Sequence, residues 1–277
     1  MGGGGARGAA HIGVLKTLHS ENIKFDLISG TSAGSVIGAM YASTKDPSWI
    51  ENRFKKFINS KPFSRLLVKK ISKNQNLGSV INQLIKKASQ GYILINGFNR
   101  TAILKKKRLR AALSFLIPCK SFQDLKIPLK VVSTDLNSGL DIINDSGNLI
   151  DAVLQSCSIP GFIEPTIKGQ YVISDGGVSM PIPVEAITDY CDFSLAIDIS
   201  NYVVKPMKKI NILEILKRSE MITSLRLKRE LSKKANFTIR PDTLGLHWSN
   251  FEKFDELIKS GETTTMKQLD NLKKAIS

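Results

Sequence analysis

The sequence predicts an α/β fold in which helices cover a mainly parallel sheet. Short apolar strands alternate with amphipathic helices along most of the chain, which is the pattern of this fold class. One short strand runs into a glycine-flanked turn at Ser32 and then into a helix of small residues. The chain has 277 residues, of which 42% are hydrophobic. That is enough to bury a full core, and we expect a single domain over 1–277.

The first half of the chain is expected to be mostly helical. Apolar residues recur at helical spacing over Gly8–His19. Phe25–Ser29 is a short apolar strand, and Ser32–Ser43 is a buried helix. Pro47–Leu116 reads as a series of amphipathic helices, and we expect a basic, cap-like helical segment at about 47–116.

The second half is expected to add most of the strands. The expected strands are Leu129–Thr134, Leu140–Ile143, Tyr171–Ser174, Phe193–Ile199 and Phe237–Arg240. The expected helices are Leu149–Ser156, one that begins in Pro183–Thr188, Ile210–Ala235, and two near Phe251–Ile258 and Thr263–Ala275. Together the last of these form a basic, helical C-terminal region at about 205–277.

The formal net charge of +16 is concentrated in two segments. Arg53–Arg110 contains 16 Lys and Arg and no Asp or Glu, and Lys205–Arg240 contains 11 basic and 3 acidic residues. This distribution favours an anionic surface as partner, although solvated helix faces give the same pattern. Aromatic residues make up 7% of the chain and are not interleaved with the basic runs, so we expect no nucleic acid partner.

Cysteine usage and hydropathy indicate the compartment. Cys119, Cys157 and Cys191 are an odd, scattered set, which argues against a disulfide framework and for a reducing environment. No Cys/His cluster has metal-ligand spacing, so no metal is expected. No apolar run approaches the ~20 residues that span a bilayer, and no secretory signal is visible. We expect a cytoplasmic protein with peripheral contact at the inner membrane surface.

Ser32 is the candidate nucleophile. It lies in the Gly-x-Ser-x-Gly sequence Gly30–Gly34, between a strand and a helix, which is the context of a nucleophile elbow. The N-terminus of the following helix favours a developing negative charge. Taken alone, the same residues also fit a serine N-cap on an ordinary strand–helix turn.

The glycine-rich run at the start of the chain is the candidate oxyanion loop. Consecutive glycines allow several backbone N–H groups to face one point, and the candidate donors are Gly3, Gly4, Gly5, Ala6 and Arg7. The spacing of Gly3, Gly5 and Gly8 also fits a dinucleotide-binding fingerprint, but that motif needs a preceding strand, which the sequence does not show. Arg7 is also a candidate to orient this loop or to contact an anionic head group.

Asp175 is the candidate general base. It follows a strand, and the two glycines after it, Gly176 and Gly177, leave its carboxylate with little steric obstruction. An Asp-Gly-Gly turn is also common without any function. A Ser-Asp dyad requires a water-poor pocket to raise the basicity of the carboxylate. His247 is the alternative base, because a triad histidine usually stands late in the chain. Asp198 ends a strand and is a candidate structural acid.

These motifs, in this order, resemble the patatin-like phospholipase family of bacterial type. The resemblance rests on the runs Gly2–Gly8, Gly30–Ser35, Ser133–Leu136, Ser156–Gly161 and Asp175–Gly177 followed by Pro181–Pro183. It covers roughly residues 2–200 and is loose over the remainder.

The resemblance implies a three-layer α/β/α fold and hydrolysis of lipid acyl esters. Ser32 attacks the ester carbonyl, Asp175 takes its proton and later activates the deacylating water, and the glycine loop holds the oxyanion. The resemblance implies no metal or organic cofactor.

Two further expectations concern the start of the chain and competing functions. Family members carry a strand immediately before the glycine-rich loop, so we expect the sequence to be truncated at its N-terminus or its start to be misassigned, with its first strand missing.

An acyltransferase or thioesterase with the same nucleophile is the alternative enzyme. A catalytically degenerate, basic membrane-binding protein is the alternative without catalysis.

Overall fold

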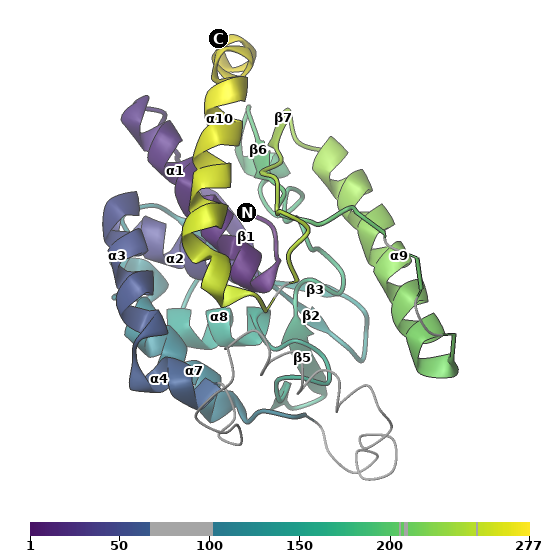
Figure 1. Cartoon of the computed structure of the whole chain (residues 1–277). Helices are drawn as coiled ribbons and strands as arrows, with labels where there is room; N and C mark the ends of the chain where they lie inside the picture. Colours follow the sequence, from purple (N-terminus) through teal and green to yellow (C-terminus); the bar gives the residue numbers. More distant parts are fainter. Residues whose placement is uncertain (67–101, 205, 208–209, 248) are drawn as a thin grey trace.

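The computed structural model describes residues 1–66, 102–204, 206–207, 210–247 and 249–277 (Figure 1). Among the described residues of the first half, a short 3₁₀ turn, η1, precedes five helices and one strand. These elements are η1 (Gly5–Gly8), α1 (Ala9–Ser20), β1 (Ile28–Thr31), α2 (Ala33–Thr44), α3 (Pro47–Ile58), α4 (Lys61–Leu66) and α7 (Lys106–Leu116). The helical prediction for Pro47–Leu116 is confirmed at α3, α4 and α7, and its central part, 67–101, lies outside the described residues.

The second half contributes the remaining strands and the two longest described helices. Its elements are β2 (Leu129–Asp135), β3 (Asp141–Asn144), α8 (Leu149–Ser156), β4 (Thr166–Lys168), β5 (Tyr171–Asp175), β6 (Leu195–Ile197), α9 (Ile212–Lys233), β7 (Phe237–Ile239) and α10 (Phe254–Ile276). Short 3₁₀ turns stand at Phe122–Asp124, Thr188–Tyr190 and Phe251–Lys253.

Two sequence predictions for this half are wrong. The helix expected to begin in Pro183–Thr188 is only the 3₁₀ turn Thr188–Tyr190. Here the Ile187 and Tyr190 amides donate to carbonyls three residues back, in successive turns rather than an α-helical ladder. The two helices expected at the C-terminus are one, α10. Gly261 does not end that helix, since it lies at a close crossing with α1. A Cβ at Gly261 would be 2.2 Å from the Ala10 carbonyl oxygen.

The central sheet is mixed, so its mainly parallel character is not confirmed. Its hydrogen-bonded order is β1-β2-β5-β4, with β3 also paired to β2. Only β1 and β2 run parallel, while β2 pairs antiparallel with β3 and β5, and β4 with β5. A second sheet contains the parallel pair β6 and β7.

The first residues of the chain lie between these two sheets. The Met1 amine donates to the Ser29 carbonyl, and the Thr31 amide donates to the Met1 carbonyl, so Met1 is bonded along β1. The Gly2 amide donates to the Ile197 carbonyl of β6 at 3.0 Å. This bridging fixes the start of the glycine loop beside β1. The expectation of a strand upstream of Gly2 stays a prediction.

Local capping explains where three of the helices begin. In each case an Asp or Asn side chain accepts a hydrogen bond from a backbone N–H in the first turn, which satisfies one otherwise unpaired donor. The caps are Asp46 for α3, Asn148 for α8 and Asn211 for α9. Pro47 at the first position of α3 strengthens that start.

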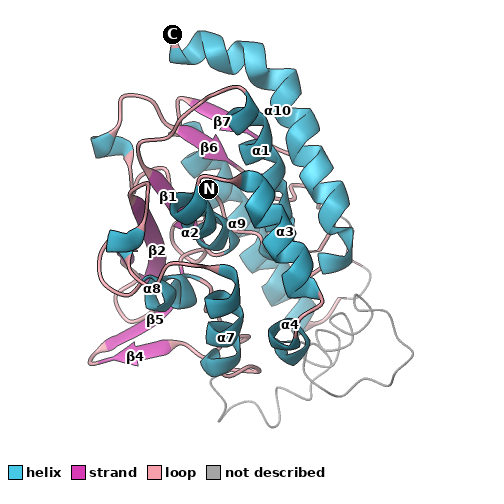
Figure 2. Ribbon diagram, turned by 90° about the vertical axis from the view of Figure 1, so that its left-hand side faces the viewer, coloured by secondary structure: helices cyan, strands magenta, loops and turns pink. Residues whose placement is uncertain are grey.

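The helices lie on both sides of the strands. Figure 1 shows α1, α2 and α3 on one side and α9 on the other, and the turned view in Figure 2 agrees. The largest hydrophobic cluster lies among α2, α3, α7, α8 and β2, and includes the fully buried Ile37, Met40 and Leu113. A packed helical layer therefore lies against β1 and β2. Ser32 directly follows β1 in the chain.

Candidate active site

Ser32 occupies a sharp, strained turn between β1 and α2. Its φ of 53° and ψ of −122° are rare for a residue with a side chain. The turn closes only because its flanking residues are glycines. A Cβ at Gly30 would be 2.6 Å from the Cα of Ser35, and one at Gly34 would be 2.0 Å from the Met1 carbonyl oxygen. The sequence Gly30–Gly34 thus folds as the expected elbow geometry.

The hydroxyl of Ser32 donates a hydrogen bond to Asp175. Its Oγ lies 2.7 Å from Asp175 Oδ2, and both residues are buried, although 143 positions separate them in the sequence. The backbone N–H of Ser32 donates to Ser156 Oγ at 2.8 Å, at the end of α8. Serine and carboxylate are therefore in direct contact, and the elbow is held from a third element.

Asp175 is held at the end of β5 by its backbone and by its other carboxylate oxygen. Its N–H donates to the Ser158 carbonyl at 3.0 Å, and Oδ1 accepts from the Gly177 amide at 2.7 Å. The backbone at Gly176 approaches β2 too closely for a side chain, because a Cβ there would lie 2.4 Å from the Val132 carbonyl oxygen. Both glycines of the Asp-Gly-Gly sequence thus serve to position the carboxylate.

The surroundings of Asp175 raise its pKa from 3.8 to about 6. Burial is the largest cause, because it disfavours the charged form. The hydrogen bonds from Ser32 and Gly177 and the positive charge of Lys228 act in the opposite direction. Asp175 is therefore ionised at neutral pH, yet more basic than an ordinary aspartate, which suits a group that accepts a proton from a serine hydroxyl.

The glycine loop lies against Ser32 and offers free amides. A Cβ at Gly3 would be 3.2 Å from Ser32 Cβ, so the two backbones are close. The Gly3 amide donates to the Pro181 carbonyl, and the Arg7 amide to the Gly4 carbonyl. Within the described part of the chain, the amides of Gly4, Gly5 and Ala6 have no such acceptor, as expected at the start of a helical turn. Three of the five candidate oxyanion donors, the amides of Gly4, Gly5 and Ala6, are therefore free to donate to a bound oxyanion.

Two basic side chains brace this loop. Arg7 Nε donates to the Gly4 carbonyl at 3.2 Å, and burial lowers the pKa of Arg7 to about 10. His11 is fully buried, and its Nε2 lies 2.8 Å from the Gly2 carbonyl oxygen. Burial lowers the pKa of His11 to about 3, so the ring is neutral and donates from Nε2 to that oxygen. Both contacts hold the loop rather than touch Ser32.

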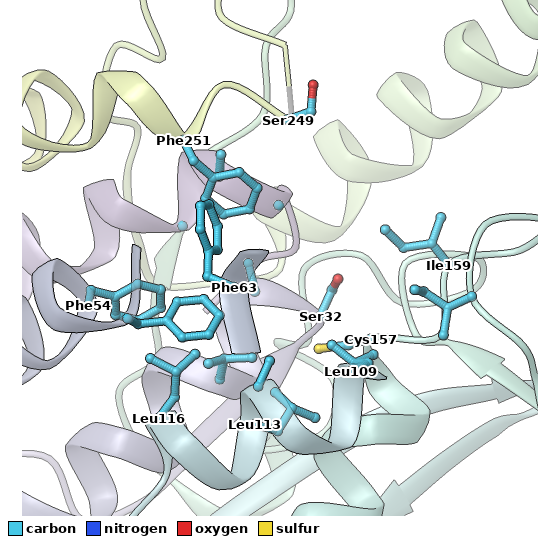
Figure 3. Close-up of a pocket in the computed structure, with 18 of the residues that line it drawn as sticks. Ser32, Phe54, Phe63, Leu109, Leu113, Leu116, Cys157, Ile159, Ser249 and Phe251 are labelled. Atoms are coloured by element: carbon cyan, nitrogen blue, oxygen red, sulfur yellow. The ribbon is translucent and has the colours of Figure 1, made fainter. Parts of the chain in front are cut away.

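An apolar pocket of about 200 Å³ opens at Ser32 (Figure 3). Its walls are aliphatic and aromatic side chains from α2, α3, α4 and α7 and from the segments around Ile159 and Phe251. Gly5 and Ala6 of the loop line it next to Ser32. In Figure 3, the Ser32 hydroxyl lies between Phe54 and Phe63 on one side and Ile159 on the other. Such a lining suits a hydrocarbon chain rather than a polar substrate.

The structure also places the remaining candidate residues. His247 Nδ1 lies 2.8 Å from Ser249 Oγ, while Asp175, and not this histidine, accepts the Ser32 hydrogen bond. Asp198 is buried, pairs with Arg240 at 2.9 Å and accepts from Tyr202 Oη at 2.7 Å, as a structural acid does. Asp135 is buried, and its carboxylate accepts hydrogen bonds from the Ser138 hydroxyl, from the Val172 amide of β5 and from amides of its own turn.

Sequence reasoning did not give a role to three residues near the pair. Ser156 anchors the Ser32 amide, and Cys157 lies on the pocket wall beside Ser32. Burial raises the pKa of the Cys157 thiol, which keeps it protonated. Lys228, on α9, acts electrostatically on both Asp175 and Arg7. The serine and cysteine lie in a run that carried the resemblance, whereas nothing local in the sequence marks Lys228.

Comparison with known proteins identifies the family. The sequence model of the patatin-like phospholipases matches residues 1–188. The chain therefore belongs to the patatin-like phospholipase family, and this membership supports a lipid hydrolase function.

The curated relatives are distant and mostly much longer. A patatin-like phospholipase domain-containing protein of Caenorhabditis elegans is 26% identical over 94% of this chain and 20% of its own length. Human patatin-like phospholipase domain-containing protein 6 is 28% identical over 67% of this chain and 12% of its own length. An uncharacterized NTE family protein of Mycobacterium tuberculosis is 26% identical over 75% of this chain and 50% of its own length.

Among solved structures, VipD of Legionella pneumophila matches 97% of this chain and 66% of its own chain, at 16% identity and a TM-score of 0.48.

Among the described residues, no helix combines the length and apolar character that crossing a bilayer requires. The same residues contain no group of three or more His, Cys, Asp or Glu that could hold a metal ion.

Proposed function

We propose that Ser32 and Asp175 form a catalytic dyad that hydrolyses carboxylic esters of lipids, of the phospholipase or lysophospholipase type. The observation that carries the proposal is the 2.7 Å hydrogen bond from the Ser32 hydroxyl to a buried carboxylate, with Ser32 lining an apolar pocket. Family membership and the strained elbow support the same assignment. The chain spans a fifth or less of its longest relatives, so the activity is a proposal for this chain itself.

In the proposed acylation step, Asp175 accepts the hydroxyl proton as Ser32 Oγ attacks the ester carbonyl carbon. The negative charge that develops on the carbonyl oxygen is stabilised by the amides of Gly4, Gly5 and Ala6. Donors of this kind contribute about 3 kcal/mol each in the transition state. The tetrahedral intermediate collapses, the alcohol leaves with the proton from Asp175, and the acyl group stays on Ser32.

In the proposed deacylation step, Asp175 takes a proton from a water molecule, and the resulting hydroxide attacks the acyl carbonyl carbon. The intermediate then releases the free fatty acid, and Ser32 recovers its proton. One carboxylate serves both steps, since its pKa of about 6 lets it accept and return a proton near neutral pH.

The pocket defines the acyl side of the substrate. The pocket lining is apolar and includes Ser32. We therefore place the acyl chain of the substrate inside the pocket and its alcohol part outside. An acyltransferase or thioesterase has the same first step, and it differs only in the group that receives or releases the acyl chain. Product analysis with a competing alcohol separates these activities.

The lipid substrate also leads us to propose that the protein works at an anionic membrane surface. The charge of +16 supports this proposal, since anionic lipid attracts basic protein surfaces.

The test is hydrolysis of a lysophospholipid and of a short p-nitrophenyl ester by the wild type and by the Ser32→Ala and Asp175→Asn variants. Ser260→Ala is the matched control, because the Ser260 hydroxyl on α10 donates to the Asp242 carbonyl and contacts neither Ser32 nor Asp175. We expect both dyad variants to lose turnover and the control to keep it. Equal turnover in wild type and Ser32→Ala would contradict the proposal.

A further inference from the structure

Helix α9 has one face against the protein and one face exposed. Leu225, Leu231 and Ser232 are buried on the inner face. The outer face of its first half is apolar and open to solvent, with exposed fractions of 80% for Ile212 and 62% for Leu216. Ile215 and Ile222 continue this face at helical spacing and are also exposed. Exposed isoleucine and leucine at such spacing mark a contact surface.

The same outer face becomes basic in its second half. Arg226, Arg229 and Lys233 follow Ile222 at intervals of three or four residues, so they lie in line with the apolar stripe. Arg229 lies over the ring of Tyr202, and Lys233 pairs with Glu230. Arg226 has no ion pair or hydrogen bond to any described residue. The whole of α9 contains six basic and three acidic residues.

The segment before α9 extends the apolar surface. Val203 and Ile210 are 63% and 83% exposed, and Val204 is also exposed. Together with Ile212, Ile215, Leu216 and Ile222 they form what we call the α9 stripe. From Ile210 onward it lies within the basic segment Lys205–Arg240, so a partner of this stripe meets both apolar side chains and a net positive charge.

The inner face of α9 reaches the neighbourhood of the dyad. Lys228 is partly buried there and lies within electrostatic range of both Arg7 and Asp175: Arg7 lowers its pKa and Asp175 raises it. Figures 1 and 2 show α9 on the far side of the strands from α1, α2 and α3, and Ile212 and Leu216 in its first half are exposed. One helix therefore connects an exposed apolar surface with the site.

We propose that α9 lies flat on an anionic lipid bilayer, with the α9 stripe inserted at the head-group boundary and Arg226 against the lipid phosphates. A basic amphipathic helix with large exposed aliphatic side chains binds membranes in this orientation. The inference deepens the proposed function, because it names the surface from which lipid would reach Ser32.

The charge of the segment favours a bilayer over a second copy of the chain. Two copies joined through the α9 stripe would bring two segments of net positive charge together, which opposes association. An anionic bilayer instead offers opposite charge and an apolar interior together. A self-associated stripe is therefore an outcome that the experiment must detect.

The experiment is co-sedimentation of the full chain with vesicles of phosphatidylcholine, alone or mixed with phosphatidylglycerol. All proteins carry Ser32→Ala, so that the lipids stay intact. The test variants are Ile212→Ser/Ile215→Ser/Leu216→Ser and Arg226→Ala. The matched controls on α10 are Met266→Ser, which is exposed and apolar, and Lys267→Ala, which is exposed and basic.

We expect the parent to bind the mixed vesicles and to dissociate at high salt. The triple variant should bind at least about tenfold more weakly, since each inserted aliphatic side chain contributes substantially. Arg226→Ala should bind about fivefold more weakly, as expected for one basic residue at such a surface. Both controls should bind like the parent.

Three results would overturn the proposal: no binding of the parent to either vesicle, unchanged binding of the triple variant, or a dimer in light scattering that the triple variant abolishes. A separate assay of the same α9 variants with Ser32 intact, on a water-soluble short ester, should show wild-type rates. Loss of vesicle binding with that activity retained places the defect at the membrane. Vesicle binding by a chain that hydrolyses no ester would instead refute the proposed function and leave the α9 surface standing.

Discussion

Replacing Asp175 by Asn should make the protein more stable at neutral pH while it removes turnover. The buried carboxylate has a folded pKa of about 6 against an ordinary 3.8, a difference worth about 3 kcal/mol. Asn keeps the shape of Asp, and its amide can donate to Ser32 Oγ while its oxygen accepts from Gly177. The variant therefore avoids the burial of a charge without losing either hydrogen bond.

The sign of the pH effect follows from the direction of the shift. Because the folded pKa lies above the unfolded value, the contribution of Asp175 to stability is fully present below pH 3.8. It is lost as the pH rises through about 6. Asn does not titrate. The free energy of unfolding of Asp175→Asn minus that of the wild type should therefore rise by up to about 3 kcal/mol between about pH 4 and about pH 8.

The assay is urea unfolding of both proteins across this pH range. Taking the difference removes the titration of all other groups that the substitution leaves unchanged. Asp270→Asn, which removes an exposed carboxylate of α10, is the control and should show no such rise. A difference for Asp175→Asn that is flat, or that falls with pH, would refute the reasoning about its burial.

Three further predictions concern the charge, shape and packing around the dyad. Lys228→Met should raise the pKa seen in the pH profile of kcat/KM for a soluble ester, because Lys228 lowers the pKa of Asp175; an unmoved profile would count against that coupling. Leu113→Phe should reduce turnover of long-chain esters more than of butyryl esters, since Leu113 lines the pocket; a uniform loss would mean that the chain binds elsewhere. Gly176→Ala should lower the free energy of unfolding by roughly 1–3 kcal/mol and reduce activity, because its Cβ would meet the Val132 carbonyl at 2.4 Å; urea unfolding at wild-type stability would contradict this.

The parts of the site that local sequence encodes could be predicted. The elbow needs glycines on both sides of Ser32, and the Asp175 turn needs two glycines after it, so both appear as short motifs at strand ends. Helix starts follow in the same way from Asp46, Asn148 and Asn211. In each case the cause lies within a few residues of the effect.

Features that depend on long-range contacts could not be predicted in this way. Ser156 holds the Ser32 amide across 124 residues, and no pattern near either residue records it. Two helices were expected where α10 is one, because nothing near Gly261 in the sequence records its close crossing with α1. The mixed sheet was missed because strand direction depends on pairing, and β4 has only three residues, too few to show an alternation.

The central claim is that Asp175 activates Ser32, and labelling with a fluorophosphonate, read by intact mass and peptide mapping, tests it most directly. If Asp175 is the base, one adduct forms, on Ser32, at a rate that falls as the pH drops through about 6 and that is strongly reduced in Asp175→Asn. An adduct on another residue, or none on a folded wild-type chain, would contradict it.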